Sequence, residues 1–332
     1  MRRIYLLISL MVFNLPFIHS QNDAEYKKPK HLRVSEAFGF IKGQNNSLDI
    51  IKNKYPELEM SAFRAQNLFK ATYGNCLEKM QNFLISAFEE EGFTAFENKL
   101  NEEVKKLTSK IDLSEDVAIS FILEVEERAK GNIPSPILET LLSFKYADYP
   151  QFEFIDGFVN VFNTKGHPKS KGTDWQIKVP KSWRKAEAER PNIIQKFISD
   201  YGDGNQSIML LVKNLDLPEG YILSKEEIDE MFSEEEMKKI AVDGTKFISY
   251  TKTTIENKIA VILEVEKTAE RLDIKTKIRM QQYMFIHNNK MYCMEGMVST
   301  KDLSKDLAAE MKKYNPVFRL VANSIVLKDK YR

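Results

Sequence analysis

The chain has 332 residues and carries 49 Lys and Arg against 48 Asp and Glu, which gives a formal net charge of +1. This balance creates no overall field that would attract DNA, RNA or anionic lipid, so we expect no nucleic acid as a partner, although a local basic patch stays open. The apolar content of 43% is typical of globular proteins, and the length is sufficient for two domains.

Residues 1–20 have the layout of a secretory signal peptide. Two arginines precede an apolar run from Ile4 to Ile18, and Ser20 stands before a polar stretch. The run of about 15 residues is shorter than the roughly 20 residues of a spanning helix, and a retained membrane anchor is the alternative. We therefore expect export to the periplasm or the medium, cleavage near Ser20, and a soluble mature chain without a membrane span.

The next two stretches differ from each other in polarity. Residues 21–34 are polar and basic, and we expect them to form a tether after the cleavage site. Residues 35–147 carry apolar side chains at three- and four-residue spacings, which predicts a helical domain of about five helices. A capping box at Thr94–Glu97 predicts one helix start, and a looser box at 112–115 opens a helix that ends at Gly131.

Aromatic residues crowd the stretch that follows. We place the domain boundary near residue 148 and interpret these residues as packing between a helical domain and a domain spanning 148–332. The alternative is an exposed aromatic binding surface. The residues are Tyr146, Tyr149, Phe152, Phe154, Phe158 and Phe162.

Beyond residue 173 the pattern is that of β-strands. Apolar residues alternate over Trp175–Val179, and the runs 193–198 and 207–212 flank a glycine-rich turn, which predicts a hairpin. Capping boxes that begin at Ser224 and Ser233 predict two short helices.

Residues 246–298 predict an antiparallel meander. Asn288 and Asn289 form a tight corner between two β-rich runs, and asparagine tolerates the positive φ that such a corner needs. A helical pattern follows over 302–314, and Pro316 is expected to restart a helix. The predicted strands cover 247–255, 259–266, 278–286 and 291–298.

Several of these features, in this order, resemble the Mog1/PsbP-like α/β/α sandwich over residues of about 150–328. They are the strand that runs into Pro180-Lys181-Ser182-Trp183, the crossover of two helices, the long meander with a tyrosine-containing hairpin, and the closing helix from Tyr314 to Ser324. The fold class is therefore expected to be α+β, an N-terminal helical bundle followed by an antiparallel-sheet α/β/α sandwich. The family consists largely of binding and assembly factors, so the resemblance implies a scaffold and brings no catalytic motif.

The sequence offers few candidates for a catalytic or metal-binding site. After residue 20 the histidines are His31, His167 and His287, which lie far apart without a carboxylate or cysteine at ligand spacing, so we expect neither a metal nor a cofactor. Ser182 and Lys185 match the S-x-x-K spacing of penicillin-recognising enzymes. The other elements of that machinery are missing from the sequence, so no catalytic residue is predicted.

The two cysteines, Cys76 and Cys293, stand in apolar contexts. Buried free thiols are the expectation, and a disulfide that joins the two domains is the alternative.

These observations favour an exported, non-catalytic protein that binds or helps to assemble a partner, either a protein or a small ligand. Two alternatives stay open: a hydrolase with its site in a cleft between the domains, and a structural component of the cell envelope. Tryptophan and arginine are common where a few residues dominate binding. The expected binding surface comprises His167, Lys169, Lys171, Trp175, Trp183 and Arg184.

Overall fold

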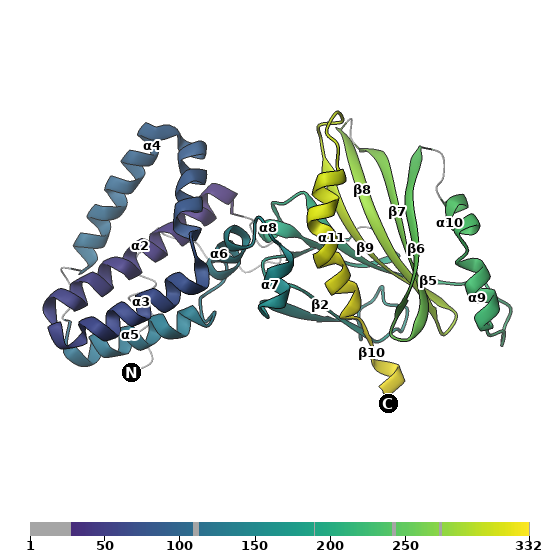
Figure 1. Ribbon diagram of the computed structural model, residues 1–332, viewed down its shortest axis with the longest axis horizontal. Coiled ribbons are helices and arrows are strands. Elements are labelled where there is room, and N and C mark those ends of the chain that lie inside the picture. The colour runs from purple at the N-terminus through teal and green to yellow at the C-terminus, as the bar shows by residue number, and fades with distance from the viewer. Residues whose placement is uncertain (1–27, 109–112, 189, 241–243, 272–273, 332) are drawn as a thin grey trace. The chain divides into compact units, whose positions relative to one another are not determined.

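The structure is a computed structural model that describes residues 28–108, 113–188, 190–240, 244–271 and 274–331 (Figure 1). The chain divides into two units, with the division between Lys145 and Tyr146. We call residues 1–145 unit 1 and residues 146–332 unit 2. The expected signal peptide, residues 1–20, lies outside the described residues.

Unit 1 is helical, as predicted. Within it, α2, α3 and α5 lie side by side (Figure 1). Tyr73, near the end of α3, donates a hydrogen bond from its hydroxyl to the carbonyl of Arg128, near the end of α5, at 3.1 Å. The elements are α2 (Lys30–Lys54), the 3-10 turn η2 (Pro56–Leu58), α3 (Glu59–Tyr73), α4 (Cys76–Thr108), α5 (Glu115–Ala129) and α6 (Ile137–Lys145).

The predicted tether is wrong for residues 30–34, because α2 already begins at Lys30. Arg33 and Val34 are buried, and Nη1 of Arg33 donates to Oγ1 of Thr140 on α6 at 3.2 Å. Arg33, which was expected in a solvated tether, is therefore part of the core of unit 1. Its hydrogen bond offsets the loss of hydration that burial imposes on a charged group.

The predicted capping box at Thr94 is also wrong. Residue 94 lies inside α4, and its hydroxyl donates to the carbonyl of Glu90 at 2.8 Å, which is the bond that threonine makes within a helix. The bend in α4 occurs instead at Glu89, where φ is 61° and ψ is 167°. The start of α5 agrees with the prediction, since Ser114 caps it by accepting a hydrogen bond from the backbone N–H of Val117 at 3.4 Å.

Unit 2 is built on a seven-stranded antiparallel sheet with the order β3-β4-β5-β9-β8-β7-β6, and β1, β2 and β10 form a separate small sheet. The strands are β1 (Val159–Asn163), β2 (Trp175–Pro180), β3 (Arg184–Ala186), β4 (Ile193–Ile198), β5 (Gln206–Asn214), β6 (Thr245–Ile255), β7 (Lys258–Arg271), β8 (Ile274–His287), β9 (Lys290–Thr300) and β10 (Val326–Leu327). The helical elements are α7 (Gln151–Ile155), α8 (Ser199–Gly202), α9 (Lys225–Met231), α10 (Glu234–Ile240), α11 (Ala308–Asn323) and η3 (Lys328–Tyr331).

The predicted meander is confirmed as β6 to β9. Asn288 and Asn289 have φ values of 48° and 54° and connect β8 to β9, as expected for asparagines in a tight hairpin. The capping box at Ser224 is complete at the start of α9. The predicted break at Pro316 is wrong, because α11 continues through this residue from Ala308 to Asn323.

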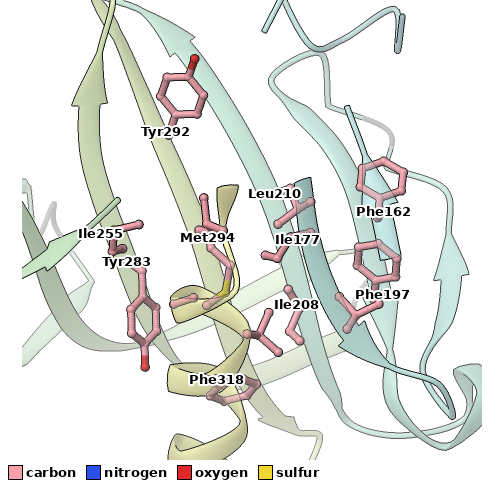
Figure 2. Packing of buried hydrophobic residues seen from close by; sticks show 14 of the residues in the cluster. Phe162, Ile177, Phe197, Ile208, Leu210, Ile255, Tyr283, Tyr292, Met294 and Phe318 are labelled. Carbon is pink, nitrogen blue, oxygen red and sulfur yellow. The ribbon is translucent and has the colours of Figure 1, made fainter. Parts of the chain in front are cut away.

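Two apolar clusters cover the two faces of the large sheet. On one face the sheet packs against α11 and the small sheet, and Figure 2 shows Phe162, Phe197 and Phe318 entering this cluster from β1, β4 and α11. On the other face, Phe232 directly follows α9 and Met237 lies in α10. Both pack on the residues of β7, β8 and β9 that point to this face. Unit 2 is therefore an α/β/α sandwich, and the chain as a whole is α+β, as predicted.

One glycine sets the approach of α11 to the sheet. A Cβ atom at Gly296 in β9 would lie 2.4 Å from Cγ of Phe318, far inside van der Waals contact. The aromatic ring therefore occupies the space that any larger residue at 296 would need.

Candidate functional site

The two tryptophans expected on the binding surface are core residues. Trp175 is 0% exposed and meets the ring of Tyr292 edge-on at 5.3 Å between centroids. Trp183 is 4% exposed and packs edge-on against Tyr314 and Phe318 at 6.3 and 6.4 Å. Their predicted place on an exposed surface is therefore wrong, because burying these large rings in the core removes far more apolar area from water.

The other predicted residues include three from the loop between β1 and β2. Buried Thr164 holds the base of this loop: its hydroxyl accepts from the N–H of Trp175 and donates to the carbonyl of Thr173, both at 3.0 Å. Farther out, Nδ1 of His167 accepts from the N–H of Lys169 at 3.2 Å. These bonds fix the direction in which the loop presents its side chains.

Two lysines tie this loop to the segment that precedes β4. Nζ of Lys169 donates to the carbonyl of Ala188, and Nζ of Lys171 donates to Oδ1 of Asn192 at 2.9 Å. An ammonium group has three donors, so each lysine retains donors beyond this contact. The loop residues singled out in the sequence therefore lie next to the β3–β4 connection.

Strand β3 brings one more cation, Lys185, to the same neighbourhood, whereas Arg184 precedes it in the strand and therefore points to the opposite face of the sheet. The guanidinium of Arg184 lies over the ring of Tyr201 at 5.3 Å, and Nζ of Lys185 lies over the ring of Phe162 at 5.3 Å. The imidazole of His167 meets the same Phe162 ring at 6.4 Å, so the loop and β3 share one aromatic contact. Lys185 was missed in the sequence, where its spacing from Ser182 suggested only a chemical motif.

We name the four side chains that meet here the basic surface; none of them is buried. They present ammonium and imidazole groups held in place by a ring and by carbonyl groups, an arrangement suited to a carboxylate or another anion. The members are His167, Lys169, Lys171 and Lys185.

Ser182, which stands beside this surface in the sequence, has a structural partner. It is 2% exposed, and its hydroxyl donates to Oε2 of Glu153 at 2.7 Å while its N–H donates to Oε1 at 2.6 Å. The carboxylate thereby anchors α7 to the turn between β2 and β3, whereas the amine of Lys185 lies over a phenylalanine ring. The hydroxyl of Ser182 is thus engaged by a carboxylate and not by that amine.

Both cysteines are free and buried, as expected. Burial raises the pKa of the Cys76 thiol to about 12 and that of Cys293 well above its usual value. Both sulfurs stay protonated near neutral pH, which is the unreactive form.

A buried polar network that the sequence did not reveal lies on β7 and β8. Nε of Arg279 donates to Oε1 of Glu264 at 2.6 Å, and Nε2 of Gln281 donates to Oε2 of the same carboxylate at 2.9 Å. The hydroxyl of Tyr283 donates to Oε1 of Gln281 at 2.9 Å, and burial raises the pKa of this tyrosine. The only signal in the sequence is polar residues at alternate positions of an otherwise apolar strand. These hydrogen bonds join side chains of β7 and β8 on a face of the sheet that is largely shielded from water.

Glu295 is a buried carboxyl on the other face of the sheet. It is 8% exposed, and it accepts a hydrogen bond from Nε2 of Gln282 at 2.7 Å. Burial raises the pKa of Glu295, and the hydrogen bond and the charges of Lys267 and Arg190 oppose this rise. Desolvation outweighs the hydrogen bond and the two charges, so the ionised form of this carboxyl is disfavoured in the folded chain.

The raised pKa of Glu295 predicts a pH-dependent stability. The folded chain binds this proton more tightly than the unfolded chain, so the stabilisation is complete below the ordinary pKa of 4.5 and is lost as the pH rises through the folded-state pKa. The variant Glu295→Gln keeps an acceptor for Gln282 but cannot ionise. We expect its melting temperature to match that of the wild type near about pH 4 and to exceed it near about pH 7.

Thermal unfolding followed by circular dichroism across this pH range measures the difference. Glu187→Gln, at an exposed position, serves as the control and should follow the wild type throughout. A constant difference between Glu295→Gln and the wild type at all pH values would contradict a raised pKa.

Within the described ranges, no three His, Cys, Asp or Glu side chains gather as they would around a metal ion. In the same part of the chain, no helix has the length and apolar character needed to cross a membrane.

No family model matches the sequence, and no curated protein matches it either. Solved structures do show similarity. Cyanobacterial PsbP from Synechocystis sp. PCC 6803 has 10% identity and a TM-score of 0.31 over 51% of this chain and 92% of its own. The Ran-binding protein Mog1p of Saccharomyces cerevisiae has 10% identity and a TM-score of 0.34 over 52% and 97%. LpqN, which is involved in cell envelope biogenesis of Mycobacterium tuberculosis, has 12% identity and a TM-score of 0.30 over 52% and 92%.

The expected resemblance to the Mog1/PsbP-like fold is confirmed over about half of the chain. It concerns the fold alone.

Proposed function

We propose that unit 2 is a non-catalytic binding domain that recognises an acidic segment of a partner protein through the basic surface. The observation that carries this proposal is the sharing of the Phe162 ring by His167 and Lys185, which joins the loop and β3 into one cationic patch. A partner that carries several carboxylates can meet these cations without any further rearrangement of the loop, since Lys169 and Lys171 are already hydrogen-bonded in place.

The chemistry of the neighbouring residues supports binding over hydrolysis. A serine nucleophile needs a hydroxyl that a substrate can reach, with a base beside it. Ser182 is buried, and its hydroxyl and its backbone N–H both donate hydrogen bonds to the carboxylate of Glu153. The pair therefore serves the attachment of α7.

The proposed site of action is outside the cytoplasm, and this part of the proposal rests on the sequence of residues 1–20. Sequencing the N-terminus of the protein recovered from its native cells tests it. A mature chain that begins near Gln21 is the expected result, and a retained Met1 in the envelope or the medium would contradict cleavage.

The basic surface is tested with two triple variants of equal charge. Lys169→Gln/Lys171→Gln/Lys185→Gln removes three of its cations, and the control removes three exposed lysines elsewhere in unit 2, Lys225, Lys301 and Lys312. The probe is a fluorescent oligoglutamate peptide, and its anisotropy reports binding. We expect the surface variant to bind about tenfold more weakly than the wild type, because each exposed pair contributes up to about 1 kcal/mol.

Three outcomes of this titration oppose the proposal. An equal loss of peptide affinity in the control variant would show that binding depends on net charge and not on the basic surface. Failure of the wild type to bind the peptide would rule out an acidic segment as the ligand. Tighter binding of an oligonucleotide of the same charge would indicate a nucleic-acid surface instead.

A further inference from the structure

Methionine is concentrated on one face of the large sheet. The apolar cluster under α9 and α10 contains six of the chain's 13 methionines, whereas the cluster under α11, which has more buried residues, contains Met294 and Met311. Methionine often fills gaps in a core because its side chain is flexible, but gap filling alone does not favour one face over the other. The six are Met209, Met237, Met280, Met284, Met291 and Met297.

Strand register brings three of these methionines around the thiol of Cys293. Met284 of β8 lies directly opposite Cys293 of β9. Met291 precedes Cys293 by two residues on the same strand, or roughly 7 Å. Met209 of β5 pairs with residue 295 and is therefore a diagonal neighbour of Cys293. Opposite residues have Cβ atoms about 4.5–5.5 Å apart and diagonal neighbours about 7–8 Å, within reach of a long side chain. We name these four residues the sulfur site.

The thiol at the centre of the sulfur site is buried and has no hydrogen-bond partner. Cys293 is 6% exposed, and no group in the described ranges accepts a hydrogen bond from its sulfur. The thiol of Cys76 differs, since it donates to the carbonyls of Tyr73 at 2.6 Å and of Leu141 at 3.4 Å. A buried polar group without a partner is unusual in a folded protein, so the Cys293 thiol invites a ligand.

The surroundings of this thiol favour a positive charge. Burial and the negative charge of Glu295 together raise the pKa of the Cys293 thiol. Both effects oppose a bare thiolate, and a cation on the sulfur would counter both. Met209 and Met291 are half-buried, so the sulfur site has one side near solvent from which an ion can enter.

We propose that the sulfur site binds a soft monovalent metal ion, Cu(I), through the thiolate of Cys293 and the thioether sulfurs of its three methionines. Thiolate and thioether ligands together select Cu(I) among the metals of proteins. Coordination breaks the S–H bond of the cysteine, forms an S–Cu bond and releases the proton to solvent. Neither the metal nor the sulfur changes its oxidation state. One positive charge replaces another, so the apolar layer gains no net charge, which keeps the cost of burial low.

The same ligands disfavour other ions. Mg²⁺ and Ca²⁺ require oxygen ligands, and structural Zn²⁺ sites are built from four cysteine and histidine ligands. A divalent ion bound to one thiolate would also bring an uncompensated positive charge into the apolar layer. The sulfur site shares no residue with the basic surface, so the two proposals stand or fall separately.

Anaerobic titration of the reduced full chain with Cu(I), in competition with a chromophoric Cu(I) chelator, measures the affinity. We expect the wild type to bind one equivalent. Cys293→Ala should weaken binding by about a hundredfold or more and Met284→Leu by about tenfold or more, because a lost ligand costs at least as much as a change in the outer shell. Cys76→Ala and Met294→Leu are the controls and should leave the affinity unchanged, since Met294 points to the other face of β9. Leucine has nearly the volume of methionine, so both leucine variants should keep the fold.

A second measurement needs no change in the ligands. Methionine methyl groups labelled with ¹³C are observed by NMR while Ag(I), a soft ion of the same charge, is added to the wild type. The methyl signals of Met209, Met284 and Met291 should shift and that of Met294 should stay, with assignments from single Met→Leu variants.

Four results would overturn the proposal. They are no binding of Cu(I) or Ag(I) by the wild type, undiminished binding by Cys293→Ala, equal losses in Met284→Leu and Met294→Leu, or shifts confined to Met60, a surface methionine that is 76% exposed. Circular dichroism of each variant, with the wild-type signal retained, ensures that a loss of binding is not a loss of fold.

Discussion

Replacing Trp175 by alanine is expected to lower the free energy of unfolding of unit 2 by about 3–5 kcal/mol, the range for deleting a buried aromatic side chain. The side chain is fully buried in the cluster between the large sheet and α11, and its ring packs edge-on against Tyr292. The deletion removes the transfer free energy of the ring and also leaves a cavity that the strands on either side cannot close completely.

Trp175→Phe provides the matched control. No described protein group accepts a hydrogen bond from Nε1 of Trp175, so phenylalanine loses no hydrogen bond and retains an aromatic ring beside Tyr292. We expect less than half of the loss found for alanine. Urea unfolding followed by far-ultraviolet circular dichroism gives both values. A loss below about 1 kcal/mol for Trp175→Ala, the range of a surface change, would mean that the residue belongs to an exposed surface after all.

Replacing Arg128 by alanine is expected to destabilise unit 1 by about 3–5 kcal/mol, the usual effect of removing one partner from a buried charged network. The side chain is 4% exposed, and its guanidinium lies 4.7 Å from the ring centroid of Phe40 and 5.3 Å from that of Phe121. It donates to Gln44 at 3.0 Å and to Glu124 at 2.6 Å. Alanine leaves the buried amide of Gln44 without this donor and opens a gap between the two rings.

Lys130→Ala is the control for Arg128→Ala, because it removes a cation two residues away that pairs with Glu127 on the surface. Its effect on the free energy of unfolding should be far smaller than that of Arg128→Ala, because an exposed ion pair contributes little to stability. Arg128→Lys should fall between the two, since an ammonium retains the charge but not the planar group that stacks on the rings. If Arg128→Ala and Lys130→Ala had equal effects on the unfolding of unit 1, the guanidinium would not be part of its core.

The strands of unit 2 could be predicted from the sequence because their signals are local. Alternating apolar residues define β7, and Val261, Leu263 and Val265 do point into one cluster. Asn288 and Asn289 identify a turn by their own backbone preferences. The burial of Arg33 and Arg128 could not be predicted, since each depends on partners far along the chain, Thr140 for the first and Gln44 for the second.

The candidate site shows the same division. His167, Lys169 and Lys171 belong to one short loop, so their proximity follows from the sequence itself. Lys185 joins them only through the Phe162 ring, a contact across two different sheets. The polar network of Glu264 and Gln281 depends on strand register, because the two residues become neighbours only when β7 and β8 pair. Tryptophan is a further case, since the same ring suits a core and a binding surface, and the sequence alone does not distinguish the two.

Gly296 carries a hydrogen atom where other residues carry a Cβ, and this small difference allows the ring of Phe318 to pack directly on β9. Adding a single methyl group at position 296 would displace α11 from β9, and α11 also brings Val317 and Val321 to the interior. A shift of the helix would separate all of these residues from their neighbours at once. The ring of Phe318, more than twenty residues later in the chain, therefore limits which residues position 296 can accept. In proteins that share this fold by descent, the two positions should change together or not at all.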